Sequence, residues 1–254
     1  MLEEGINNSE NIKSKLEQGD LESVIFDLDS TLVNTDKYYK DWMNGSTRSF
    51  LEEFNIEYEE SDLHEIYMYG VQIHREAGQP LLITEYVTGG LILYLKERGR
   101  EDIEKVSPYI EQYLSEFYCN SPEIEDGTLE VLYELKQKGH LFGIYSHAQQ
   151  DWTEKKVRKI EHEYSIRYHE EIVIPFFTTP IDKRKDCQGW TDASDYFGFN
   201  LEKTLVIGDS MNSDIIPAKE AGCRNLVHIS TEEEDSNDRM VTRIKGIRQL
   251  LEHL

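Results

Sequence analysis

The pattern of apolar and polar residues divides the chain into an alternating α/β part and a purely helical part. Residues 24–26 and 204–207 are short runs of β-branched, aromatic and aliphatic side chains. Such continuous apolar runs are typical of strands that are buried on both faces of a parallel sheet. Each run ends in a polar turn that contains an acidic residue, Asp27 in the first and Asp209 in the second. We therefore expect two buried strands with acidic carboxyl ends.

Residues 34–121 show a different pattern, in which large apolar side chains recur at the spacing of amphipathic helices. No strand-like alternation interrupts this pattern, and glycines mark the breaks between the expected helices. We therefore predict an all-helical insertion at residues 34–121. The polar residues 1–20 form an N-terminal extension, for which disorder and a short helix through Ile12 and Leu16 both fit the pattern.

The chain returns to alternating helices and strands after residue 121. The pattern predicts helices at 127–138 and 190–197 and strands at 141–145, 170–177 and 225–229, the last of these being the final strand. Pro175 would end its strand or place it at a sheet edge. A closing amphipathic helix is predicted at 241–251. Residues 21–33 and 122–254 would thus form a doubly wound, mainly parallel α/β core.

The charge of the chain narrows the partners that it can bind. The formal net charge is -23, from 50 acidic and 27 basic residues. Nucleic acids and anionic membranes call for basic surfaces, so we expect neither as a partner. No stretch approaches the ~20 apolar residues of a membrane span, and the first residues lack the features of a signal peptide. We therefore expect a cytoplasmic protein. Cys119, Cys187 and Cys223 are odd in number and far apart, which argues against a disulfide framework.

Asp27 and Asp29 follow the first apolar run and lie two residues apart. Residues at this spacing share a face of an extended segment, so both carboxylates can address one small volume at the carboxyl edge of the sheet. The two carboxylates would repel each other, and such a pair is tolerated when a cation lies nearby or one acid keeps its proton. The simpler alternative is an acidic turn whose side chains only bond local backbone groups.

Asp209 repeats this arrangement after the second apolar run, and Asp214 lies near the start of the helix that follows. An acid near a helix N-terminus is commonplace by itself, because it caps free backbone N–H groups. Two acidic strand ends in one α/β chain are nevertheless a stronger signal of function than either of them alone.

Hydroxyl and basic side chains supply further candidates. Ser146 directly follows a predicted strand, where its hydroxyl could donate to a phosphoryl oxygen or cap the next helix. Lys183, Arg184 and Lys185 form a basic cluster in this acidic chain. A cation there could stabilise a phosphoryl group with spreading negative charge, and a solvated basic turn is the alternative. Lys185 is our first choice because it leads most directly into the predicted helix at 190–197.

Taken together, these segments resemble the four motifs of the haloacid dehalogenase (HAD) superfamily. Phe-Asp-Leu-Asp-Ser-Thr-Leu at residues 26–32 is similar to the first motif, and Val-Ile-Gly-Asp-Ser with Asp214 is similar to the fourth. The strand that ends in Ser146 resembles the second motif. The basic residue of the third would lie within 183–185, where an ungapped count against some relatives points to Arg184. The motifs follow the family's order and span most of the chain.

The resemblance implies catalysis of phosphoryl transfer by carboxylates. Asp27 would be the nucleophile that forms an aspartyl-phosphate. Asp29 would be the general acid and then the general base, for which a pKa raised towards the working pH is suitable. Ser146 and Lys185 would hold the phosphoryl oxygens.

The resemblance also implies bound Mg²⁺ and a cap domain. Mg²⁺ prefers oxygen ligands, which Asp27, the backbone carbonyl of Asp29 and Asp209 would supply, with Asp214 either as a further ligand or as a support for the others. The helical insertion at 34–121 would be the cap, which in such proteins closes over the active site and selects the substrate.

Among the activities of such proteins, the residues favour a phosphatase acting on a small phosphorylated metabolite. Dehalogenase relatives lack the second acid of the first motif and need no metal, whereas this chain has Asp29. Phosphoserine phosphatases share the Asp-Leu-Asp-Ser-Thr form, but the segment around Ser146 lacks the glycines expected there. A phosphomutase of the β-phosphoglucomutase kind, which must exclude water from the phospho-enzyme, is one alternative. A non-catalytic HAD-like binding protein is the other, and its lack of need for four mutually repelling acids argues against it.

Overall fold

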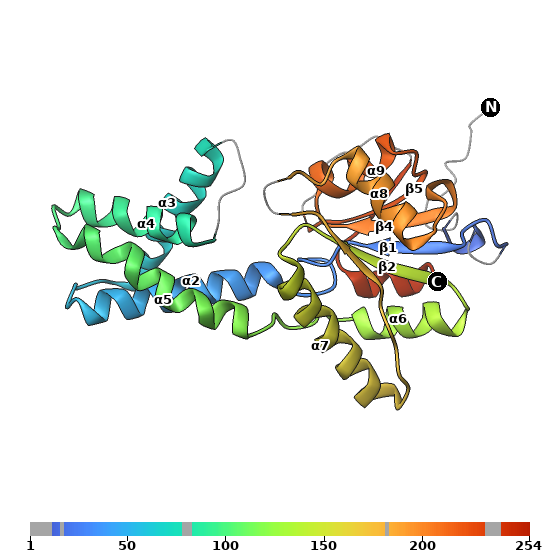
Figure 1. Cartoon of the computed structure of the whole chain (residues 1–254), viewed down its shortest axis with the longest axis horizontal. Helices are drawn as coiled ribbons and strands as arrows, with labels where there is room; N and C mark the ends of the chain where they lie inside the picture. Colours follow the sequence, from blue (N-terminus) through green and yellow to red (C-terminus); the bar gives the residue numbers. More distant parts are fainter. Residues whose placement is uncertain (1–11, 16–17, 78–82, 181–182, 232–239) are drawn as a thin grey trace. The chain divides into compact units, whose positions relative to one another are not determined.

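A computed structural model of the protein describes residues 12–15, 18–77, 83–180, 183–231 and 240–254 (Figure 1). The chain divides into two compact units, one of Met1–Thr35 with Pro122–Leu254 and the other of Asp36–Ser121. Residues 12–15 are helical, and the buried Ile12 belongs to the core of the first unit. Residues 1–11 and Leu16 lie outside the described residues. No described helix is long and apolar enough to cross a membrane.

The first unit contains a six-stranded sheet in the described part of the chain, with the order β3-β2-β1-β4-β5-β6. All neighbouring strands are parallel. The strands are β1 (Ser23–Phe26), β2 (Leu141–Ser146), β3 (Phe176–Thr178), β4 (Thr204–Gly208), β5 (Asn225–Ile229) and β6 (Val241–Ile244). This is the strand order of a doubly wound Rossmann-type sheet, so the predicted fold class is confirmed.

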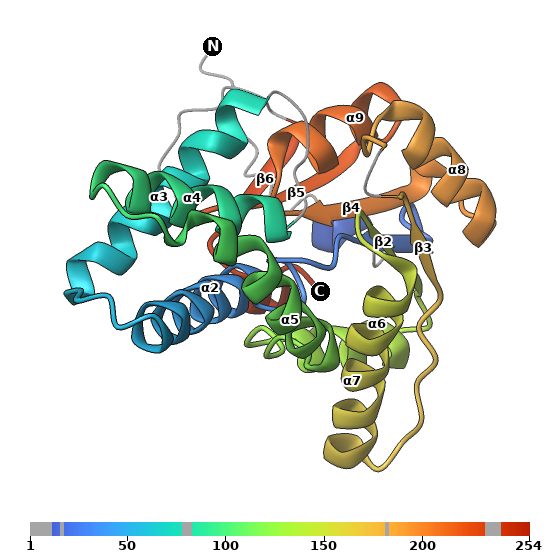
Figure 2. The same ribbon diagram turned by 60° about the vertical axis from the view of Figure 1, so that its left-hand side comes forward.

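Alternate residues of β1 explain the continuous apolar run. Val24 and Phe26 belong to one core cluster, whereas Ile25 belongs to another. The first cluster includes side chains of α6 (Thr128–Gln137) and α7 (Gln150–Tyr168), and the second includes side chains of α8 (Cys187–Phe197) and α9 (Ile216–Glu220). Figure 2, like Figure 1, shows these two pairs of helices on opposite faces of the sheet. A strand covered on both faces needs apolar side chains in both directions.

The strand predicted at 170–177 is wrong in its position. Residues 171–175 are not part of the sheet, and β3 begins at Phe176, after Pro175 rather than before it. The backbone N–H of Ile174 donates to Glu161 Oε1 of α7 at 2.8 Å instead of to a neighbouring strand. Val173 is 83% exposed. The apolar run at this point is therefore a segment that packs against a helix with only some of its side chains.

The closing helix predicted at 241–251 is also wrong. Val241–Ile244 is strand β6, which pairs with β5 at the edge of the sheet, and only Ile247–Glu252 forms a short 3₁₀ helix. Three of the four residues of β6 are β-branched, which favours an extended backbone over a helix. The strand β5 has the predicted bounds, but it is not the last strand.

All the described secondary-structure elements of the second unit are helices. It contains α2 (Thr35–Glu53), α3 (Glu60–Ala77), α4 (Ile83–Glu97), a 3₁₀ helix at Asp102–Lys105 and α5 (Val106–Cys119). These helices enclose their own core, which includes Phe50, Leu91, Tyr94 and Ile110. The large apolar side chains that recur at helical spacing thus fill a core within this unit.

The prediction that glycines mark breaks between helices is wrong at Gly45 and Gly90, which lie inside α2 and α4. Gly90 instead allows α3 and α4 to approach each other closely. A Cβ atom on Gly90 of α4 would lie 2.5 Å from the backbone oxygen of Ile66 and 3.1 Å from the backbone nitrogen of Gly70, both in α3. Backbone atoms cannot yield as a flexible side chain can, so only a residue without a side chain fits at position 90.

The packing of these two helices can be tested with matched glycine substitutions. Gly90→Ala is expected to lower the free energy of unfolding of the helical unit by roughly 1–3 kcal/mol, because overpacking forces the helices apart. Gly45→Ala in α2 is the control, since a Cβ there meets nothing within 4 Å. Replacing this helical glycine should stabilise the unit by about 0.4–1 kcal/mol. Urea unfolding of both variants measures the difference, and equal stabilities would contradict the close approach of α3 and α4.

Candidate active site

The candidate site lies where strands β1 and β4 end. Phe26 of β1 pairs with Ile207 of β4, and the N–H of Asp27 donates to the carbonyl of Ile207 at 2.8 Å. Strands β2 and β3 lie on one side of β1, whereas β4, β5 and β6 lie on the other. The strand order therefore reverses between β1 and β4, and open α/β sheets bind their ligands at such a switch point. Asp27 and Asp209 both follow strands that end there.

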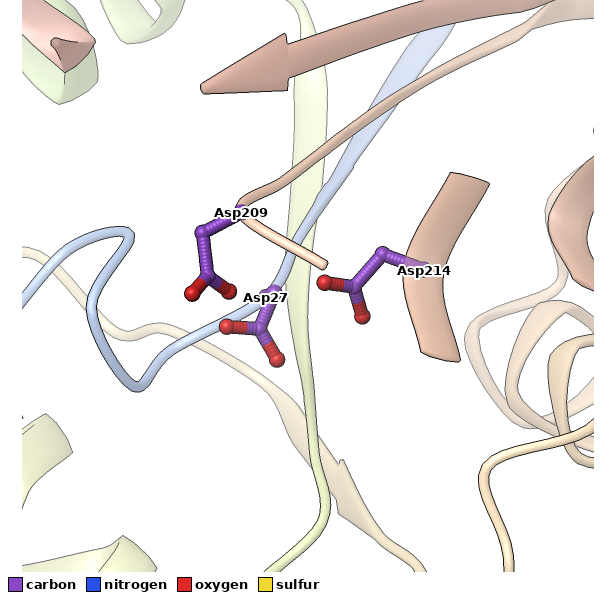
Figure 3. Close-up of side chains that lie close together, drawn as sticks. All are labelled: Asp27, Asp209 and Asp214. Atoms are coloured by element: carbon purple, nitrogen blue, oxygen red, sulfur yellow. The ribbon is translucent and has the colours of Figure 1, made fainter. Parts of the chain in front are cut away.

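Three carboxylates meet at this point. Asp27, Asp209 and Asp214 each offer one oxygen, and these oxygens all lie within 4.8 Å of one another. Figure 3 shows that the three carboxylates point toward one another, Asp27 and Asp209 from the loops after their strands and Asp214 from a helical turn. Asp27 and Asp214 are buried and Asp209 is half-buried. A hard divalent cation such as Mg²⁺ prefers a set of oxygen ligands of this kind.

The ammonium group of Lys185 lies between two of these carboxylates. Its Nζ donates to Oδ1 of Asp27 at 2.7 Å and to Oδ1 of Asp214 at 2.6 Å. Burial opposes the charged form, but the carboxylates of Asp214 and Asp27 raise the pKa of Lys185 above its usual value. Lys185 is buried, whereas Lys183 and Arg184 are exposed. Of the three basic residues in the cluster, Lys185 is thus the one that reaches the acids.

The site carries more negative than positive charge, which favours the binding of another cation. Burial raises the pKa of Asp27 well above its usual range; Lys185 opposes this rise, and the charges of Asp214, Asp209 and Asp29 add to it. Lys185 is thus one cation among several carboxylates. A divalent cation between the acids would offset the remaining repulsion. The donor atoms and the charge of the site therefore both fit Mg²⁺.

The local sequence explains how Asp214 enters the site. Ser210 begins a single π-helical turn, Met211–Ile215, that carries Asp214. The N–H of Ser210 donates to Oδ2 of Asp214 at 3.0 Å. A Cβ atom on Gly208 would lie 2.5 Å from the side chain of Asp214. The glycine at the end of β4 therefore makes the space into which the Asp214 carboxylate folds back.

Asp29 lies in a separate set of hydrogen bonds. The chain turns sharply after β1, with Ser30 in the left-handed backbone region at a φ of 58°. Oδ1 of Asp29 accepts from Thr35 Oγ1 at 2.5 Å and from Lys156 Nζ at 2.5 Å. Ser146 Oγ donates to the other oxygen, Oδ2, at 3.3 Å. The structure thus brings Ser146 next to Asp29, at the end of the neighbouring strand β2.

Lys156 is the residue that the sequence analysis missed. It belongs to α7 and is completely buried, although lysine is rarely found inside proteins without a partner. The sequence does carry a signal for it. Trp152, Lys156, Ile160 and Tyr164 follow one another at intervals of four and are all buried. A lysine in the apolar stripe of a helix is a candidate for a buried ion pair.

Comparisons with known proteins identify the family. Residues 21–222 match the family profile of the haloacid dehalogenase-like hydrolases. A comparison with curated proteins gave no significant match.

Solved structures share the fold. A protein assigned as a β-phosphoglucomutase from Thermotoga maritima is 18% identical, with a TM-score of 0.62, and the match covers 91% of this chain and 97% of that one. YfnB from Bacillus subtilis, a protein assigned as a HAD hydrolase and bound to magnesium, is 17% identical with a TM-score of 0.60, and the match covers 91% of this chain and 96% of that one. A protein assigned as a phosphoglycolate phosphatase from Haemophilus somnus is 17% identical with a TM-score of 0.57, and 91% and 97% are covered. Dehalogenases are also among the similar structures. The chain belongs to the haloacid dehalogenase-like hydrolases.

Proposed function

We propose that the protein is a Mg²⁺-dependent phosphomonoester hydrolase that acts on a small phosphorylated metabolite through an aspartyl-phosphate. The observation that carries this proposal is the buried ammonium of Lys185 between Asp27 and Asp214 at the switch point of the sheet. This arrangement supports a role for Asp27 as the carboxylate nucleophile, beside a cation that can hold the phosphoryl oxygens. A second acid, Asp29, follows two residues later for the transfer of protons.

In the first step, a carboxylate oxygen of Asp27 attacks phosphorus and the bond from phosphorus to the substrate alcohol breaks. Lys185 holds Oδ1 of Asp27, so we assign Oδ2 as the attacking oxygen. Asp29 gives a proton to the departing alcohol. In the second step, Asp29 takes a proton from water, and the water oxygen attacks phosphorus. The bond between phosphorus and Asp27 breaks, which releases inorganic phosphate and restores the Asp27 carboxylate. Lys185 holds the phosphoryl oxygens during both steps. Ser146 joins it by turning its single O–H from Asp29 to the phosphoryl group.

Asp27, Asp209 and the backbone carbonyl of Asp29 would hold Mg²⁺. When bound, this ion offsets the negative charge of the nucleophile and the phosphoryl group together. Both oxygens of Asp214 already accept hydrogen bonds, one from Lys185 and the other from the backbone of Ser210. This favours Asp214 as the residue that fixes Lys185 and supports the ligands. The four acids of the site also favour hydrolysis of a phosphate ester over dehalogenation, because dehalogenation does not require so many carboxylates.

Phosphate release from a panel of small phosphomonoesters tests the proposal directly. The wild-type protein is expected to release phosphate with Mg²⁺ and to stop when the metal is chelated. Asp27→Asn should lower turnover by at least about 10³-fold, because the amide cannot replace the nucleophile. Asp195→Asn, an exposed acid of α8, is the matched control and should keep wild-type activity.

Two outcomes would contradict this function. One is a folded, Mg²⁺-loaded protein that releases phosphate from no ester. The other is an Asp27→Asn variant as active as the Asp195→Asn control. Transfer of phosphate to a second hydroxyl of a sugar phosphate, without release, would instead indicate a phosphomutase.

Metal binding can be measured without turnover. Mg²⁺ at 100 times its dissociation constant should add about 2.7 kcal/mol to the free energy of unfolding of the wild-type protein, because the folded state alone presents the site. Asp209→Asn should lose most of this stabilisation, since it removes a carboxylate ligand and leaves the ion pairs of Lys185 with Asp27 and Asp214 in place. Thermal unfolding with Mg²⁺ and with a chelator provides the comparison. Equal stabilisation of both proteins would place the metal elsewhere.

The role of Lys185 separates from that of its basic neighbours. Lys185→Met is expected to abolish phosphate release and to destabilise the metal-free protein by about 3–5 kcal/mol, because it leaves buried carboxylates without their cation. Lys183→Met is the control and should change stability by less than about 0.5 kcal/mol, since Lys183 is exposed. Thermal unfolding and the phosphate assay give both readouts. Normal activity in Lys185→Met would remove the lysine from the proposed mechanism.

A further inference from the structure

A second buried lysine lies beside the proposed proton-transfer residue. Nζ of Lys156 donates to Oδ1 of Asp29 at 2.5 Å, and its side chain is 0% exposed. We propose that Lys156 is a positioning residue, which fixes the carboxylate of Asp29 so that Oδ2 exchanges the proton with the substrate. The proposal rests on the phosphatase function given above and goes beyond it.

Stability alone does not explain why a lysine occupies this buried position. Burial of an ammonium group is unfavourable unless it is paired, and a buried ion pair is often no more stabilising than an apolar side chain of similar size. Lys156 lies in the buried stripe of α7 together with Ile160 and Tyr164, where an apolar residue would continue the pattern. Nζ of Lys156 lies 3.9 Å from the ring centroid of Trp152, whose face covers the ammonium. The fold thus places a cation in a region suited to apolar side chains and directs it at Asp29.

The two oxygens of Asp29 have different partners. Oδ1 accepts from both Lys156 and Thr35, each at 2.5 Å. Oδ2 faces Ser146, whose hydroxyl lies at 3.3 Å. Rotation of the carboxylate would break both of the short hydrogen bonds to Oδ1. These bonds therefore present Oδ2 on the side of Ser146, which we have assigned to the phosphoryl group.

Exposure separates the roles of the two residues. The side chain of Asp29 is 27% exposed, whereas that of Lys156 is not exposed at all. A substrate can thus reach Asp29 but not Lys156, so the lysine acts through the carboxylate. The contribution of a general acid depends on its position relative to the oxygen that it protonates. That contribution is large for an alkyl alcohol, which leaves poorly as an alkoxide, and small for nitrophenolate, which leaves without a proton.

This difference gives a test that a purely structural role would not pass. In Lys156→Met, kcat/KM for alkyl phosphates is expected to fall about 10- to 100-fold more than kcat/KM for p-nitrophenyl phosphate, part of the 10²–10⁴-fold that general acids contribute. Lys155→Met carries the same change on the exposed side of α7 and should leave both values unchanged. An equal loss for both kinds of ester in Lys156→Met would overturn the proposal. Should this variant not fold, Lys156→Leu, which also removes the donor to Oδ1 and continues the apolar stripe of α7, serves for the same comparison.

A double-mutant cycle identifies the residue through which Lys156 acts. In an Asp29→Ala background, Lys156→Met should cause no further selective loss with alkyl phosphates, because the carboxylate that it positions is gone. A selective loss that persists in this background would overturn the proposal by showing that Lys156 acts elsewhere.

A crystal structure of Lys156→Met provides a readout that does not depend on activity. The Asp29 carboxylate is expected to leave its present orientation or to adopt more than one. An unchanged orientation would overturn the positioning role even if phosphate is released. If the wild-type protein hydrolyses no ester, the phosphatase proposal fails, and the orientation of Asp29 in the variant still decides whether Lys156 positions it.

Discussion

The repulsion among buried carboxylates at the end of β1 and β4 is the constraint on which the rest of the site depends. Asp27 and Asp214 are both buried, and one ammonium group, that of Lys185, lies between them. Removal of charged groups from water costs several kcal/mol for each ion in a protein, and attraction between them offsets this only when the geometry is good. The fold must therefore hold the three segments that carry these groups in a fixed geometry. They are the end of β1, the turn after β4 and the segment before α8.

The surroundings of Lys185 supply this rigidity. Nζ of Lys185 lies 4.7 Å from the ring centroid of Tyr145 and 4.9 Å from that of Trp190, so aromatic faces cover the cation. The indole N–H of Trp190 donates to the carbonyl of Ser213 at 2.9 Å, in the turn that carries Asp214. The residue that covers the lysine thus also holds the backbone beside one of its partners. Sites of this kind reduce stability in exchange for function, which is why we interpret the cluster as an active site rather than as a structural ion pair.

The strands that are buried on both faces could be predicted from the sequence alone. Residues 24–26 of β1 and 205–207 of β4 are all apolar because helices cover both sides of the sheet, and the acids after them mark where the strands end. The edges of the sheet were harder to predict. Residues 171–175 and Val241–Ile244 have one-sided or partial burial, so tertiary contacts rather than the local pattern decide between coil, strand and helix. Lys185 could be chosen among three adjacent basic residues from the local sequence, because it lies closest to the start of α8. The role of Lys156 could not be predicted in this way, because its partner Asp29 lies 127 positions away in the sequence.

Two acids that are neighbours in the sequence acquire different environments because the sheet is covered on both faces. Lys185 precedes α8, which packs on the face that Ile25 contacts, whereas Lys156 belongs to α7, which packs on the face of Val24 and Phe26. Each acid is therefore paired with a cation from a different layer of the fold: Asp27 with Lys185, and Asp29 with Lys156. Separate partners allow two identical side chains to take separate parts, which in our proposal are attack on phosphorus and the transfer of protons. The doubly wound arrangement supplies both cations at one sheet edge, and a sheet covered on a single face would have only one layer from which to draw them.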